Sequence, residues 1–161
     1  MRARVDTAVE VALIVLMGAL VLNVTWQVIS RYLLGSPSTF TDELARFLLI
    51  WVSLLGAAYA SGRNLHLAID LYPNSLGPAG RRRLDLLIDS IVILFVTAVL
   101  IVGGGTLVYT TYVYLQLTPT LQIPMAYVYL IGPISGVLIV YYKLSDIRRR
   151  GLGARPDSAP A

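Results

Sequence analysis

Four long apolar runs constrain this chain more than any other feature of its sequence. They lie at 8–30, 44–60, 84–108 and 124–144. A helical crossing of a bilayer core about 30 Å thick needs roughly 20 apolar residues, so each run has about the required length. A transmembrane β-strand would show about ten residues of alternating polarity, whereas these runs are continuous. The sequence therefore predicts an all-α membrane protein with four transmembrane helices.

Composition supports a single membrane domain. Hydrophobic residues make up 57% of the 161 residues and charged residues only 14%, a balance too apolar for a water-soluble domain. We expect residues 1–150 to form one four-span domain without internal repeats, and residues 151–161 to form a polar, disordered tail. The first run is too long for a signal-peptide core and no A-x-A cleavage site follows it, so we expect an uncleaved anchor.

The distribution of basic residues predicts the orientation of the four spans. Eleven of the 13 basic residues lie before the first run, between the second and third, or at or beyond the end of the fourth, whereas only Arg31 and Arg46 lie on the other side. Because basic residues in short loops stay in the cytoplasm, both termini and the middle loop are predicted to be cytoplasmic. This topology also explains the net charge of +4. Basic residues at 81–83 and 148–150 are expected to meet anionic lipid headgroups, and we expect no nucleic-acid partner.

The start of the second span carries the most informative side chains. Thr41, Asp42 and Glu43 suit a helix start, because carboxylates there meet the positive end of the helix dipole. Glu43 and Arg46 stand three residues apart on one helical face. A charge is costly at the bilayer centre, so this acid and arginine pair is predicted to lie at the outer interface or against protein, with Trp51 further along the span. Ordinary interfacial anchoring and internal packing remain an alternative.

A second set of polar side chains follows this span. In a helix, Arg63, His66 and Asp70 would share one face and apolar residues another, which predicts a short in-plane amphipathic helix between the second and third spans. A strand over 65–71 is the alternative, but it would leave its backbone unpaired at the bilayer surface. His66 is the only histidine, so it cannot supply both axial ligands of a membrane haem. A hydrogen bond to Asp70 or to a partner is its expected role.

Glycines mark places where helices can approach one another closely. They are Gly56 in the second span, Gly103, Gly104 and Gly105 in the third, and Gly132 and Gly136 in the fourth. In membranes, small residues allow neighbouring backbones to come into contact, so we predict helix packing at these positions. Pro133 lies between the last two glycines and predicts a local kink.

The sequence lacks signals of enzymatic chemistry. It contains no cysteine, no serine nucleophile with a recognisable histidine base, no phosphate-binding loop and no cluster of metal ligands. We therefore predict no catalytic residues, no metal site and no cofactor.

These features together resemble the small membrane subunit of tripartite ATP-independent periplasmic (TRAP) transporters, the DctQ family. The resemblance covers residues 5–149. It depends on the Glu43-Leu-Ala-Arg46 opening of the second span, Trp51, the small residues 56–58, and the ordered polar residues at 63, 66 and 70 before an arginine-rich return. No single residue is distinctive, whereas their ordered combination is.

The resemblance implies a subunit of the bacterial inner membrane without a substrate pocket of its own. Such a subunit associates with a large multi-span subunit of the DctM type, which carries substrate and sodium. A periplasmic solute-binding protein of the DctP type delivers the solute, and the complex takes up organic acids. The candidate inter-subunit or lipid contacts are Glu43, Arg46, Trp51, Arg63, His66 and Asp70, and the outer loops 34–40 and 118–125 are candidates for meeting the binding protein.

Two other functions remain as alternatives. A self-contained four-span exporter would depend on a membrane-embedded carboxylate, and the only candidate in the first span, Glu10, lies near its inner end. A membrane anchor of a respiratory enzyme would require haem ligands, for which only His66 is available. A scaffold role needs neither, and the chain shows no discontinuous repeated halves of the kind that form transporter sites.

Overall fold

The computed structural model describes residues 2–33, 35, 39–63 and 78–151. Its helices are α1 (Arg2–Leu33), α2 (Thr39–Gly62), α3 (Pro78–Val96), the π-helix η1 (Thr97–Gly103), α4 (Gly104–Val113), α5 (Met125–Tyr129) and α6 (Ile131–Gly151). The predicted in-plane helix, with His66 and Asp70, lies outside these residues. The tail was predicted over 151–161; Gly151 is the last residue of α6, and residues 152–161 lie outside the described residues.

Four helical segments are long and apolar enough to cross a membrane, which confirms the predicted fold class. They are Arg4–Leu33, Thr39–Gly62, Leu84–Val113 and Met125–Arg148. Each extends beyond the apolar run from which it was predicted, because polar residues at the ends continue the helix. No strand occurs in the described ranges, where the only β-type pairing is an isolated bridge between Leu117 and Pro124.

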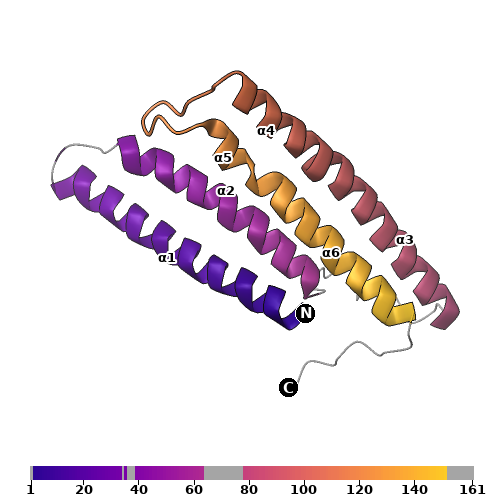
Figure 1. The fold of residues 1–161 in the computed structure, drawn as a ribbon. Coiled ribbons are helices and arrows are strands. Elements are labelled where there is room, and N and C mark those ends of the chain that lie inside the picture. Colours follow the sequence, from indigo (N-terminus) through magenta and orange to yellow (C-terminus); the bar gives the residue numbers. More distant parts are fainter. Residues whose placement is uncertain (1, 34, 36–38, 64–77, 152–161) are drawn as a thin grey trace.

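The four spans lie side by side in one layer (Figure 1). The order across it is α1, α2, α5 with α6, and then α3, η1 and α4. The fourth span is the most enclosed, with 44% of its apolar window buried, whereas only 6% of the first span's window is buried. A small apolar core of Ala58, Val96 and Ile139 joins α2, α3 and α6. The first span is thus an edge helix that packs against α2.

The third and fourth spans cross at glycines. A Cβ on Gly104 would lie 3.2 Å from the Pro133 ring, and one on Gly136 would lie 2.9 Å from Cγ1 of Ile101. Gly132 faces Gly104, with 3.9 Å between its own Cβ position and the Cα of Gly104. These absent side chains allow the two backbones to approach closely. The other three glycines at which packing was predicted have no such neighbour. Gly56 and Gly105 have open space where a Cβ would stand, and Gly103 has only a carbonyl oxygen of its own span nearby.

Both of these spans are interrupted. The third contains the π-helix η1, which the sequence analysis did not anticipate and which lies against α6. The fourth breaks at Leu130, between α5 and α6. Pro133 explains this break because it has no N–H to donate to the carbonyl of Tyr129, four residues earlier. The kink was predicted at Pro133, and the structure shows a helix break at Leu130, three residues earlier.

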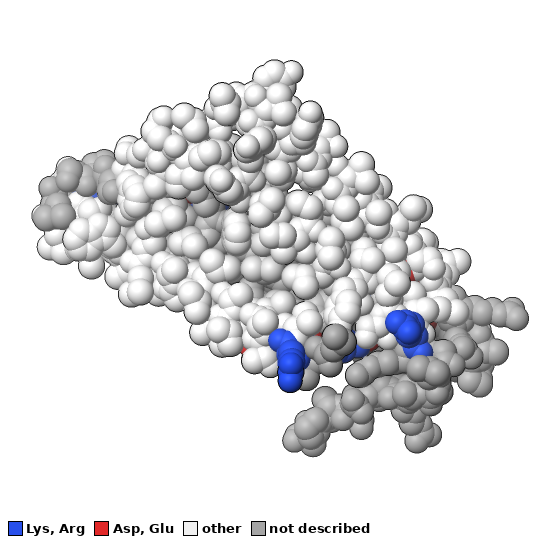
Figure 2. Space-filling view, in the orientation of Figure 1, with Lys and Arg blue, Asp and Glu red and all other residues white. Residues whose placement is uncertain are grey.

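The layer has two polar ends. One, which we call the loop end, is formed by the start of α2 and the α4–α5 loop. The other, the amino-terminal end, is formed by the starts of α1 and α3 and the ends of α2 and α6. On the face shown in Figure 2, basic side chains are most prominent at the amino-terminal end. This asymmetry agrees with the basic-residue pattern from which the orientation was predicted.

The glycine crossing generates a first prediction. Gly136→Leu should lower the stability of the purified chain by about 1–3 kcal/mol, because the new side chain overpacks against Leu100 and Ile101. Gly105→Leu is the matched control, since open space surrounds its Cβ position. Melting temperatures in mild detergent would measure both effects. Equal melting temperatures for the two variants would contradict the close crossing.

Candidate functional site

Glu43 attaches the α4–α5 loop to the start of α2. Its side chain is buried, with 9% exposure, and its Oε2 accepts hydrogen bonds from the backbone N–H groups of Thr120 and Leu121, both at 2.9 Å. Hydrogen bonds to a carboxylate are stronger than those between neutral groups. The position in the first turns of α2 also places the negative charge near the positive end of the helix dipole. Glu43 therefore holds a backbone segment 77 residues away in the sequence.

The predicted pairing of Glu43 with Arg46 is wrong. Arg46 instead forms an ion pair with Asp42, one helical turn earlier, at 2.7 Å. The side chains of this pair are 74% and 48% exposed, so the pair contributes little to stability in water. Glu43 points elsewhere because two backbone donors of the loop reach it. The sequence prediction that Glu43 lies against protein fits this placement, and the partner is the chain's own loop.

The loop that Glu43 holds has an ordered hydrogen-bond pattern of its own. Thr118 is completely buried, its N–H donates to the carbonyl of Ile123 at 2.9 Å, and its hydroxyl accepts from the N–H of Ile123 at 3.1 Å. Leu115 and Gln122 adopt positive φ angles of 47° and 55°, which turn the chain at both sides of this pairing. The sequence showed only an uncharged connection, because its hydrogen bonds involve mainly the backbone.

Three further side chains join neighbouring elements, two of them at the loop end and Trp51 in the middle of α2. Asn23 on α1 donates to the carbonyl of Thr41 at 2.8 Å, and Gln27 donates to the carboxylate of Asp42 at 3.2 Å. Trp51 on α2 donates its indole N–H to the carbonyl of Val128 in α5 at 3.2 Å. Trp51, a candidate for contacts between subunits, thus makes a contact within the chain.

At the amino-terminal end, Arg2 joins three helices. Its guanidinium donates to the carboxylate of Asp146 on α6 and to the carbonyl of Gly62 at the end of α2. The guanidinium also lies over the ring of Tyr142, 5.7 Å from its centroid. A Cβ on Gly62 would lie 2.9 Å from that ring, so only glycine fits between α2 and Tyr142 without displacement.

A second ion pair at this end joins α3 to α6. Nζ of Lys143 lies 3.0 Å from Oδ1 of Asp89, and the side chains are only 3% and 1% exposed. Lys143 is one of the basic residues whose distribution predicted the cytoplasmic side, whereas no motif in the sequence indicated a role for Asp89 or Asp146. The pair could have been predicted from the sequence, because acids and a lysine stand at the ends of the third and fourth spans that meet in the structure. Intramembrane charges are costly unless they are paired.

The remaining candidate residues lie apart from these contacts. Arg63 is exposed, and its guanidinium donates to the hydroxyl of Tyr59 at 2.6 Å and lies over its ring. Glu10 is exposed on α1. Among the described residues, no three acidic or histidine side chains are grouped as metal ligands would be.

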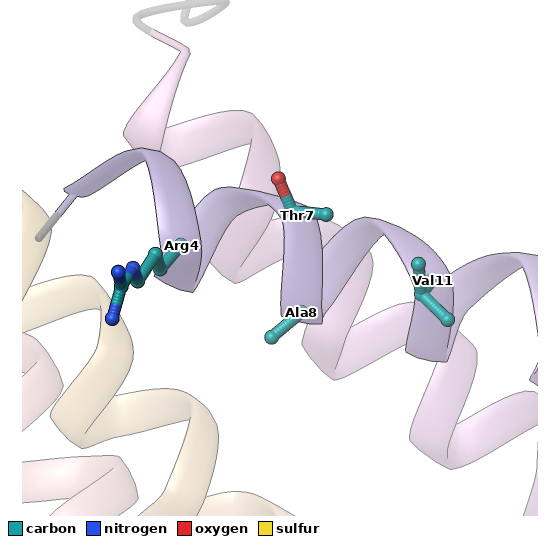
Figure 3. Close-up of a pocket in the computed structure, with 4 residues that line it drawn as sticks. All are labelled: Arg4, Thr7, Ala8 and Val11. Carbon is teal, nitrogen blue, oxygen red and sulfur yellow. The ribbon is translucent and has the colours of Figure 1, made fainter.

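The surface of the described residues has shallow hollows, among them the following two. A shallow one follows α1 near its start and is lined by Arg4, Thr7, Ala8 and Val11 (Figure 3). The other is apolar and lies between α2 and the third span, where Gly103 and Gly104 form part of its wall. A site for a small polar solute needs several polar groups that converge in a cavity. The strongest polar contacts in the described ranges instead join one helix to another.

Comparison with known proteins shows the family to which the chain is similar. Residues 20–151 match the family described as the DctQ component of tripartite ATP-independent periplasmic transporters. The sialic acid TRAP transporter small permease protein SiaQ of Vibrio cholerae is 29% identical over 147 residues, which are 91% of this chain and 83% of that protein. The C4-dicarboxylate TRAP transporter small permease protein DctQ of Rhodobacter capsulatus is 31% identical over 107 residues, which are 66% of this chain and 47% of that protein.

A third relative is much longer. The isethionate TRAP transporter permease protein DctMQ of Oleidesulfovibrio alaskensis is 26% identical over 135 residues, which are 80% of this chain but only 21% of that protein.

The Glu43 contact generates the second prediction. Glu43→Ala should leave the N–H groups of Thr120 and Leu121 without their acceptor, at a cost of about 1–3 kcal/mol, and increase hydrogen exchange at these two amides. Glu43→Gln should be milder because its amide oxygen can still accept. Arg46→Ala is the control, since its ion pair is exposed. Unchanged loop exchange in Glu43→Ala would show that the loop does not depend on this carboxylate.

The buried ion pair generates the third prediction. Lys143→Met should destabilise the chain by about 3–5 kcal/mol because Asp89 would remain charged and buried without this partner. The double variant Lys143→Met with Asp89→Leu should recover much of this loss, since both charges are removed. Unfolding in detergent, followed by circular dichroism, would give the three stabilities. A double variant as unstable as the single one would argue against the pairing.

Proposed function

The chain belongs to the DctQ family of TRAP transporters, and from this premise we propose that it is the scaffold subunit against which a large transport subunit moves. It is a small permease subunit of a transporter and not an enzyme. The observation that carries the proposal is the attachment of its four spans to one another at both ends of the layer. Such a layer can remain rigid while a neighbour changes conformation.

We propose that the large partner is of the DctM type. The DctMQ relative, a permease protein much longer than this chain, supports this partner because its name joins the two subunit designations. Gly56 and Gly105 are candidates for contact with the partner's helices, because open space surrounds both Cβ positions. Arg46 and Arg63 are candidates for polar contacts with the partner or with lipid, since both are exposed.

We propose that the loop end faces the periplasm and meets the solute-binding protein. The basic-residue pattern supports this orientation, with both termini cytoplasmic in the bacterial inner membrane. Glu43 and Trp51 would then act by positioning the α4–α5 loop and α5. Residues 1–150 would form the single membrane unit. The transported solute would be an organic acid taken up with sodium.

The alternatives are less well supported. Glu10, the carboxylate that an exporter would need, lies on the exposed surface of the edge helix α1. The respiratory-anchor alternative depended on His66, which lies outside the described residues. The family assignment favours neither function.

The fourth prediction tests the scaffold role and the loop contact separately. Co-expression with the neighbouring genes of its operon, followed by purification through a tag on this chain, should yield a stoichiometric complex with a multi-span protein. Pro119→Glu with Thr120→Glu, two exposed loop positions, should leave this complex intact but reduce uptake of solute delivered by the binding protein.

Arg148→Glu is the control, because this exposed residue lies at the other end of the layer. Recovery of the chain without a multi-span partner would refute the scaffold role. Normal uptake by the loop variant would refute only the loop contact.

A further inference from the structure

We propose that Arg2 and Asp146 form a clasp that fixes the amino-terminal half of the edge helix α1 to the rest of the layer. The clasp is a conformational element of this chain, and it does not depend on the proposed transport partners. When it is closed, the first and last spans are held together at one end. When it is open, the start of α1 can move away from α6.

The packing of α1 shows why such a contact is needed. In the described part of the chain, α1 packs extensively against α2 alone, and α2 in turn packs against α6. The side chains of α1 are mostly exposed. In a bilayer, these apolar side chains are as well accommodated by lipid as by another helix, so apolar burial does not hold an edge helix in place. Arg2 supplies a polar contact that reaches past the end of α2.

The chemistry of Arg2 fits this role on two helices at once. The side chains of Arg2 and Asp146 are 17% and 7% exposed, so water competes weakly for their ion pair. Gly62 lies in the last turn of α2, where carbonyls have no partner within the helix and the helix dipole is negative. A guanidinium has several donors in a fixed fork, so one side chain can satisfy the carboxylate and the carbonyl together.

The clasp and the second ion pair of this end both involve residues of α6. Tyr142, whose ring is completely buried under Arg2 and against Gly62, directly precedes Lys143 in sequence. Lys143 binds Asp89 on α3. The two ion pairs join α1 and α3 to α6, and the hydrogen bond from Arg2 to the carbonyl of Gly62 adds α2, so all four spans are connected at the amino-terminal end. Removing Arg2 should release α1 alone, because the pair between α3 and α6 does not involve it.

The chain has no cysteine, so spin labels can be attached at introduced cysteines only. We would label exposed positions Arg4 and Leu144 to report on the amino-terminal end, and Val28 and Tyr127 to report on the loop end. Pulsed electron paramagnetic resonance on the full chain in lipid nanodiscs gives both distance distributions. Arg2→Ala should add a longer-distance population between the labels at 4 and 144 and leave the pair at 28 and 127 unchanged.

Matched variants make the result specific. Asp146→Ala should give a smaller change than Arg2→Ala, because Arg2 keeps the carbonyl of Gly62, and the double variant should match Arg2→Ala since both remove one shared interaction. Arg31→Ala removes a basic residue from the other end of α1 and should change neither distribution.

An unchanged distribution for Arg2→Ala would overturn the clasp. So would additive changes in the double variant, or an equal change at both ends of the layer, because each would mean that Arg2 does not act locally through Asp146. None of these measurements requires a transport partner. Failure of the clasp and failure of the scaffold function are therefore distinguishable.

Discussion

The absence of a hydrophobic driving force between helices in lipid is the constraint on which this structure depends. Apolar side chains gain little by leaving lipid for another helix, so the four spans need other reasons to stay together. The first span shows this most clearly, since it is the least enclosed of the four. Polar contacts at helix ends and close backbone approach at glycines supply those reasons, and this explains how a single layer can persist without a large core.

The two ends of the layer use different chemistry. At the loop end, a carboxylate and side-chain amides bind backbone groups, so the α4–α5 loop becomes part of the layer through Glu43. At the amino-terminal end, buried charges bind one another through Arg2 with Asp146 and Lys143 with Asp89. Between them, Gly132 and Gly136 of α6 fit against the third span where it becomes a π-helix. The glycines and the Lys143–Asp89 pair both join the third and fourth spans, whereas Arg2 joins α1 to α6 and Glu43 joins α2 to the α4–α5 loop.

This division suits the proposed scaffold role. In the DctQ family, the small permease works within a larger transporter, and the strongest polar contacts described here are internal. Glu43 and Trp51, candidates for contacts with a partner subunit or with lipid, make contacts within the chain, Glu43 with the α4–α5 loop and Trp51 with α5. The exposed surface of the described residues carries many large apolar side chains, with exposed arginines near the helix ends.

The sequence by itself determined the fold class and the number of spans, because a bilayer crossing requires a long apolar helix and that requirement is visible in local composition. It also identified Glu43 and the glycines of α6 as positions of interest, and it placed a kink near Pro133. Only the tertiary structure decided which partner each of these residues has. Arg46 was the nearest opposite charge to Glu43 in sequence, yet two loop amides from 77 and 78 residues away bind its carboxylate. The pairs formed by Arg2 and by Lys143 likewise depend on how helices distant in sequence come together, because an ion pair is set by proximity in space and not by spacing along one helix.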